Sequence, residues 1–260
     1  MSGPQFLGRR YRERMGARFR SFTASYKESD LWIGVDPGSY SGRMEDFASS
    51  RARKHRLDLE HYIAQRPDFL ASLVPMAPDP EAPSIARAML AASAAAGVGP
   101  MAAVAGAVAA FVCAEMEAEF DCREIVVENG GDIRLRFEEE IELSVFAGSS
   151  PLSERVGVSI PPSFSPLGVC TSSGTVGPSL SLGRADAAMV VCRDAALCRD
   201  AALADAWATA IGNVVAGPED IDDALGLAEG RDGIVSVLVI KDDRMGIRGE
   251  LPLRLFDRGY

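Results

Sequence analysis

A carboxylate and a hydroxyl stand four residues apart in an alanine-rich stretch late in the chain. Asp205 and Thr209 lie in the sequence ADAWATA, a composition that favours a helix. On a helix the two side chains sit one turn apart on the same face, where both oxygens can bind one hard cation such as Mg²⁺. The same spacing fits an ordinary solvated helix face equally well, so the pair alone leaves both interpretations open.

A cluster of hydroxyl groups precedes that helix in the sequence. The residues TSSGT supply four hydroxyls and one glycine at which the backbone can turn tightly. Such a loop suits the oxygens of a phosphate group or a ribose. The candidate ligand-binding residues in it are Thr171, Ser172, Ser173, Gly174 and Thr175.

The sequence NGGD at residues 129–132 marks a tight turn. Residues 124–127 before it are rich in β-branched side chains, and residues 133–137 after it alternate apolar side chains with arginines, so we expect a β-hairpin. Turn chemistry by itself accounts for this sequence, because Gly supplies positive φ and Asn or Asp bonds its own backbone. A ligand-binding role for the turn therefore needs support from elsewhere in the chain.

The histidines and cysteines give no site by spacing. His55 and His61 are six residues apart, which is not a helical metal pair, and we expect both at the surface. The five cysteines are odd in number and contain no paired short spacing, which supports neither a disulfide framework nor a zinc or iron–sulfur site. We expect them to be reduced, mostly buried side chains that pack as small apolar groups. They are Cys113, Cys122, Cys170, Cys192 and Cys198.

Composition indicates a globular protein that does not bind nucleic acid or membranes in general. With 47% hydrophobic residues the chain can bury a large core, and its net charge is −10. The arginines at residues 9–20 fit a frayed terminus or an edge strand better than an RNA-binding arm, because few aromatic residues accompany them. The apolar residues 101–120 include glutamates, and no apolar segment follows the charged start of the chain, so we expect a soluble cytoplasmic protein.

Hydrophobic periodicity predicts a mixture of antiparallel strands and helices, an α+β fold. A proline-rich stretch at residues 67–83 separates the first strands and helix, residues 1–66, from residues 84–260. Strands are predicted at residues 18–26, 31–35, 124–127, 133–137, 138–146, 156–160, 187–192, 234–240 and 245–255, and helices at residues 44–65, 84–96, 101–120, 203–215 and 219–228.

Three of these pieces, in order, resemble the ApbE-like flavin transferase superfamily, and in particular an uncharacterised cytoplasmic branch of it. They are the Gly/Ala-rich helix after residue 100, the NGGD turn, and the TSSGT loop followed by ADAWATA. The resemblance spans about residues 99–213 and implies one ApbE-like domain over residues 1–260, with antiparallel sheets and helices packed around a ligand groove. Residues 67–83 would then be a crossover and residues 84–260 the groove-forming core.

The resemblance also implies ligands and roles. In the transferases the groove holds FAD, and a Mg²⁺-dependent reaction passes FMN to a threonine or serine hydroxyl of a target protein, releasing AMP. Asp205 and Thr209 match the metal-binding Asp and Thr of the family's D-A-x-x-T pattern. The family's G-G-D turn beside the flavin corresponds to Gly130, Gly131 and Asp132, with Asn129 before them, and its T-S-G loop corresponds to Thr171, Ser172, Ser173 and Gly174, followed by Thr175.

One part of the family pattern is missing. The transferases carry an H-x-x-D-P-x-T-G segment before the Asp205 helix, and this chain has no histidine there. Asp186 or Asp132 would have to replace that base. Three functions follow: a protein that binds a flavin or adenine nucleotide without transferase chemistry, a Mg²⁺-dependent FMN transferase with a protein acceptor, or a non-catalytic structural or assembly subunit.

Overall fold

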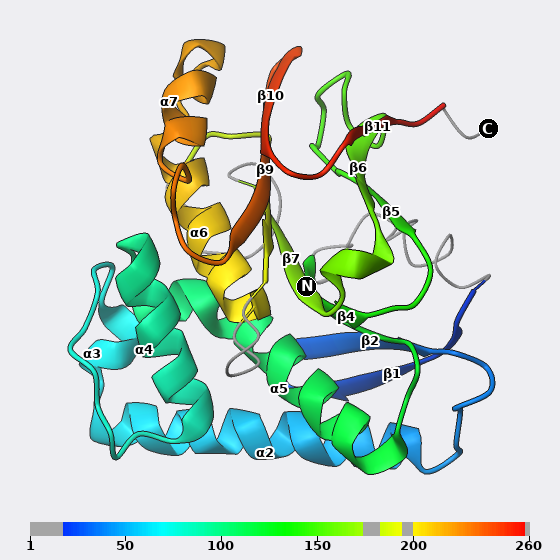
Figure 1. Ribbon diagram of the computed structural model, residues 1–260. Helices are drawn as coiled ribbons and strands as arrows, with labels where there is room; N and C mark the ends of the chain where they lie inside the picture. Colours follow the sequence, from blue (N-terminus) through cyan, green and yellow to red (C-terminus); the bar gives the residue numbers. More distant parts are fainter. Residues whose placement is uncertain (1–17, 174–182, 194–199, 258–260) are drawn as a thin grey trace, which may run out of the picture.

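The computed structural model describes residues 18–173, 183–193 and 200–257. Within these residues an eight-stranded sheet runs through the molecule, with every neighbouring pair of strands antiparallel (Figure 1). Its strands, in spatial order, are β1 (Arg20–Tyr26), β2 (Ser29–Val35), β3 (Ile125–Asn129), β4 (Asp132–Arg136), β7 (Leu167–Ser172), β8 (Ala187–Cys192), β9 (Ile234–Lys241) and β10 (Arg244–Gly249).

Helices cover one face of this sheet and a second, smaller sheet covers the other. The helices are α2 (Met44–Gln65), α3 (Asp68–Ala71), α4 (Ser84–Ala96), α5 (Val104–Phe120), α6 (Asp200–Val214) and α7 (Ile221–Gly226). The smaller sheet has the order β11 (Leu253–Leu255), β6 (Val156–Ile160), β5 (Ile141–Ser144).

The alternation of side chains along the strands separates two cores. Ile33 and Val127 point into the core beneath α2, α4 and α5, whereas Trp32 and Val126 point into the core shared with the smaller sheet. Successive strand residues face opposite sides of a sheet, so this central sheet buries both of its faces. The predicted α+β fold is confirmed.

The segmentation predicted from sequence holds at several points. The helix at residues 44–65 has the predicted ends, and the NGGD turn joins β3 to β4 with Gly130 at φ 69° and Gly131 at φ 111°. The apolar helix begins with a short 3₁₀ turn at Pro100–Ala103 and continues as α5.

The segment Pro100–Phe120 is long and apolar enough to cross a membrane by length and composition. In this fold it packs instead between the sheet and the helices α2 and α6, and half of its most apolar stretch is buried in protein. The alanine and glycine content that makes the segment apolar also lets its neighbours approach closely.

Two expectations are wrong. Thr171 and Ser172, which were expected in a loop, form the end of the central strand β7. This strand carries Gly168 because a Cβ atom there would overlap the backbone of Ala201 in α6. His55 is buried and not on the surface: its Nε2 lies 3.2 Å from Glu115 Oε2, and its ring meets Phe111 edge-on at 5.2 Å. The helix α2 lies against α5, which the sequence pattern of α2 alone did not reveal.

Candidate functional site

Asp205 lies where the helix α6 meets the first turn of α5. The backbone N–H of Gly106 donates a hydrogen bond to Asp205 Oδ2 at 3.0 Å. The first N–H groups of a helix have no partner within the helix, and the helix dipole favours a negative charge there. The carboxylate of α6 therefore caps the neighbouring helix α5.

The spacing of these two helices is set by main chain against main chain. A Cβ atom at Gly106 would overlap the carbonyl oxygen of Ala201, and one at Gly168 would overlap the amide nitrogen of the same residue. The first turn of α6 is thus held between a glycine of α5 and a glycine of β7. Asp205 follows on the next turn.

Two further side chains reach Asp205 from the sheet. Asp132 of β4 and Cys170 of β7 are cross-strand partners, and both are buried. The Cys170 thiol donates to Asp205 Oδ1 at 3.8 Å. One candidate ligand atom from each of Asp132, Cys170 and Asp205 lies within 4.8 Å of the other two. We call these three residues the acidic centre; they meet where β4, β7, α5 and α6 come together (Figure 1).

A positive charge or a proton is needed to balance the two carboxylates of the acidic centre. Asp132 Oδ1 is buried and has no hydrogen-bond partner among the residues that the structure describes. Burial raises the pKa of Asp132 to about 7, and the nearby charge of Glu128 acts in the same direction. Burial, followed by the charge of Asp132, holds the pKa of Asp205 well above its usual range, although the N–H groups of Gly106 and Ala105 oppose the shift. A bound cation would remove the repulsion between the two carboxylates.

The NGGD turn and the end of β7 lie beside the acidic centre. Asn129 Nδ2 donates to the carbonyl oxygen of Ala105 at 3.1 Å, which ties the turn to the start of α5. The position of a Cβ atom on Gly131 is 3.7 Å from the carbonyl oxygen of Thr171. The structure therefore brings Asn129, Gly130, Gly131 and Asp132 next to Thr171 and the following half-buried Ser172 and Ser173.

Three further residues were predicted in the site: Thr209, Gly174 and Thr175. Thr209 is half-buried one turn beyond Asp205 on α6. Gly174 and Thr175 lie outside the described residues.

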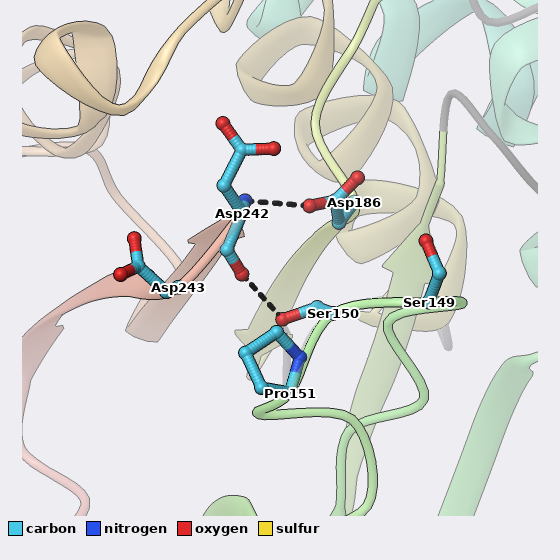
Figure 2. Close-up of a pocket in the computed structure, with 6 residues that line it drawn as sticks. All are labelled: Ser149, Ser150, Pro151, Asp186, Asp242 and Asp243. Carbon is cyan, nitrogen blue, oxygen red and sulfur yellow. Dashed lines mark hydrogen bonds between the residues drawn. The ribbon is translucent and has the colours of Figure 1, made fainter.

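Asp186 belongs to another pocket. It lines an open pocket of about 310 Å³ together with residues that include Ser150, Asp242 and Asp243 (Figure 2). The backbone N–H of Asp242 donates to Asp186 Oδ2 at 2.6 Å, and Lys241 Nζ lies 3.7 Å from Asp186 Oδ1. Val190 is the cross-strand partner of Cys170, and Asp186 comes four residues before Val190. Four residues of extended chain span roughly 13 Å, so Asp186 is separated from the acidic centre by about that distance.

A second group of charges, which the sequence did not suggest, lies between β4, α5 and α6. Arg134 of β4 donates through Nε to Asp200 Oδ1 at 3.1 Å and through Nη1 to Glu117 Oε1 at 2.9 Å. The same Nη1 lies 3.4 Å from Cys113 Sγ. Burial raises the pKa of Asp200, and the charge of Arg134 opposes that rise. We call Arg134, Asp200 and Glu117 the ion-pair group.

The fold indicates the class of protein. An antiparallel sheet packed with helices is the α+β architecture that the resemblance to the ApbE-like flavin transferase superfamily implied. The chain belongs to the family described as "AbpE bacteria", whose model matches residues 12–227.

Relatives support this assignment along most of the chain. A "UPF0280 protein" of Methanococcus aeolicus is 38% identical over 232 residues, which cover 88% of this chain and 89% of the relative. A "UPF0280 protein" of Methanothrix thermoacetophila is 43% identical over 209 residues, covering 80% and 84%. The apo crystal structure of the Pseudomonas stutzeri flavinyl transferase ApbE superposes with a TM-score of 0.50 at 14% identity, covering 88% of this chain and 93% of that one. The last likeness shows the shared fold.

Proposed function

We propose that this protein binds a flavin or an adenine nucleotide by its phosphates, through a divalent cation at the acidic centre, and that it has little or no FMN transferase activity. The observation that carries the proposal is the convergence of two buried carboxylates, Asp132 and Asp205, where no described residue bonds Asp132 Oδ1. Two like charges in a buried site are costly unless a proton or a cation compensates them.

The donor set suits a divalent cation. Asp205 and Asp132 supply carboxylate oxygens from different elements, and Thr209 supplies a hydroxyl on the same helix as Asp205. Mg²⁺ binds such oxygens, commonly completes its shell with water and substrate phosphate, and would neutralise phosphate charge here. Without a cation the acidic centre would repel a phosphate group.

The surrounding backbone and hydroxyls suit the rest of a nucleotide. The Gly130–Gly131 turn brings backbone with no side chain next to Thr171, and Ser172 and Ser173 extend from the same strand end. Groups of this kind bind phosphate and ribose oxygens. We place the ligand along this edge.

The residues for transfer chemistry are less complete. A serine or threonine acceptor must lose its proton, and efficient transfer uses a base near the attacking hydroxyl. The two histidines lie on α2. His55 is buried against Glu115, and His61 is hydrogen-bonded to Gln65. Asp186 already accepts a hydrogen bond from the backbone of Asp242. This leaves Asp132, whose pKa burial raises to about 7, as the candidate base at the centre.

Calorimetry with FAD and Mg²⁺ tests the binding half of the proposal. We expect micromolar affinity, about 8 kcal/mol, for the wild type. Asp205→Ala should weaken binding at least about tenfold, or about 1.4 kcal/mol, because it removes a cation ligand. Equal affinity in both proteins would remove Asp205 from the site. An absorbance spectrum of the purified wild type, read for a flavin band, is an independent check.

Intact mass spectrometry tests the chemical half. Incubation with FAD, Mg²⁺ and a threonine-containing acceptor protein should give little or no covalent FMN adduct, because the family's histidine segment is missing. Stoichiometric modification would contradict this and make the protein an FMN transferase. The variants Asp132→Asn and Asp186→Asn would then show which carboxylate serves as the base.

A further inference from the structure

Cys170 gives the acidic centre a donor that Mg²⁺ does not use. We propose that Asp132, Cys170 and Asp205 form a site for a borderline divalent cation of the Zn²⁺ class, and that this cation competes with Mg²⁺ for Asp205. The competition rests on the proposed function above. The binding of the Zn²⁺-class cation does not.

The distance between the sulfur of Cys170 and the oxygen of Asp205 is close to that expected for a tetrahedral ion. With a bond of about 2.3 Å to sulfur and about 2.1 Å to oxygen, tetrahedral angles place the sulfur and the oxygen about 3.6 Å apart. Cys170 Sγ and Asp205 Oδ1 are 3.8 Å apart. Adjacent ligands of an octahedral Mg²⁺, by contrast, lie only about 2.9 Å apart.

Each carboxylate has an oxygen that an ion could use. Within the described part of the chain Asp132 Oδ1 has no hydrogen-bond partner, and the residue is 8% exposed. Gly106 N–H occupies Asp205 Oδ2 and so orients the carboxylate, while Oδ1 faces the thiol. Hydrogen bonds to the outer atoms of ligands raise metal affinity in this way.

The chemistry of the donors selects the ion. Cys170 must release its thiol proton to solvent when it binds, since the thiolate is the ligand. Thiolate favours Zn²⁺ over Mg²⁺, which prefers oxygen alone. Three protein donors leave a fourth tetrahedral position for water or a phosphate oxygen, the arrangement of catalytic and not of closed structural zinc sites.

Cobalt spectroscopy on the full chain, without nucleotide, tests metal binding directly. Co²⁺ added to the metal-free wild type should give a sulfur-to-cobalt charge-transfer band, which added Zn²⁺ removes. The band should be lost in Cys170→Ser and kept in the control Cys122→Ser, because Cys122 follows the far end of α5. Zn²⁺ affinity should fall at least about tenfold in Cys170→Ser, with Mg²⁺ affinity unchanged.

Other outcomes would overturn the proposal. An absent band in the wild type, or an unchanged band in Cys170→Ser, removes Cys170 from the site. Thermal unfolding of each metal-free variant shows whether it folds. Asp132→Asn provides a second route, because it keeps the sulfur: we expect the cobalt band to remain and the Co²⁺ affinity to fall about tenfold.

The competition has its own test. Zn²⁺ should lower the apparent affinity of the wild type for FAD in Mg²⁺, and should do so much less in Cys170→Ser. No effect in the wild type contradicts the competition. If FAD does not bind at all, the proposed function fails, while the cobalt result still decides whether the metal site exists.

Discussion

The ion-pair group and the acidic centre share the strand β4 and the helix α6 and differ in how their charges are balanced. The strand β4 supplies Arg134 to one and Asp132 to the other, and α6 supplies Asp200 and Asp205. The ion-pair group has an arginine between two carboxylates, whereas the acidic centre has two carboxylates and a thiol.

The difference separates structural burial of charge from burial that points to a ligand. A buried ion pair with its hydrogen bonds made needs nothing further from outside the chain. In the acidic centre Asp132 Oδ1 has no partner in residues 18–173, 183–193 and 200–257, and a buried polar atom without a partner needs a specific explanation. The pocket at Asp186 shows that several acidic residues do not by themselves indicate a ligand. The carboxylate of Asp186 there already accepts a hydrogen bond from the backbone of Asp242.

The largest effect is expected from breaking the ion-pair group. Arg134→Met leaves Asp200 buried and unpaired, and should lower the free energy of unfolding by about 3–5 kcal/mol. Urea denaturation measures it. The double variant Arg134→Met with Asp200→Asn should recover part of the loss, because the unpaired charge is gone. A loss below about 1 kcal/mol would show that the group is not a balanced unit.

At the acidic centre, removing a charge should raise the free energy of unfolding, whereas at the ion-pair group it should lower it. The folded pKa of Asp132, about 7, lies above its ordinary value of 3.8, so the folded state keeps a proton that the unfolded chain releases. Its contribution to stability is therefore full below about pH 4 and is lost as pH rises through about 7, by up to about 4 kcal/mol.

Urea denaturation across that pH range, without divalent cations, checks the sign. Asp132→Asn should remove most of this pH dependence and should be the more stable protein at pH 7.5, because one of two like charges is gone. A wild type that gains stability from pH 5 to pH 7.5 relative to Asp132→Asn would contradict the raised pKa.

The smallest effect is expected at the third acidic region. Asp186→Asn removes the charge beside Lys241 and weakens a hydrogen bond from Asp242, so it should lower the free energy of unfolding by about 1 kcal/mol. Its affinity for FAD and Mg²⁺ should equal that of the wild type in calorimetry. A loss like that of Asp205→Ala would join this pocket to the acidic centre.

Local patterns were enough to predict much of the fold. The NGGD turn required the β3–β4 hairpin, and the ends of α2 followed from its composition and flanking turn. Asp205 also stood out, since its spacing to Thr209 is a property of one helix. These features depend on residues close together in the chain.

Features that depend on distant residues were missed. The spacing of the cysteines gave no role to Cys170. Its neighbours in the acidic centre are aspartates on β4 and α6, which are distant from it in the sequence. Arg134 was noted only as part of the alternation in residues 133–137, but helices cover that face of the sheet and Asp200 bonds it there. His55 was misplaced for the same reason, since Glu115 and Phe111 of α5 surround it.

The two glycines that hold the first turn of α6 also bear on which ions the centre accepts. Gly106 and Gly168 meet Ala201 through main-chain atoms, which have no rotamers with which to relax. Asp205 can therefore adjust to an ion by turning its own side chain, and not by sliding of its helix. Ca²⁺ needs bonds of about 2.3–2.6 Å and six to eight oxygens. In the proposed cation site, discrimination by ionic radius would thus depend on two glycines that offer no donor atom to the ion.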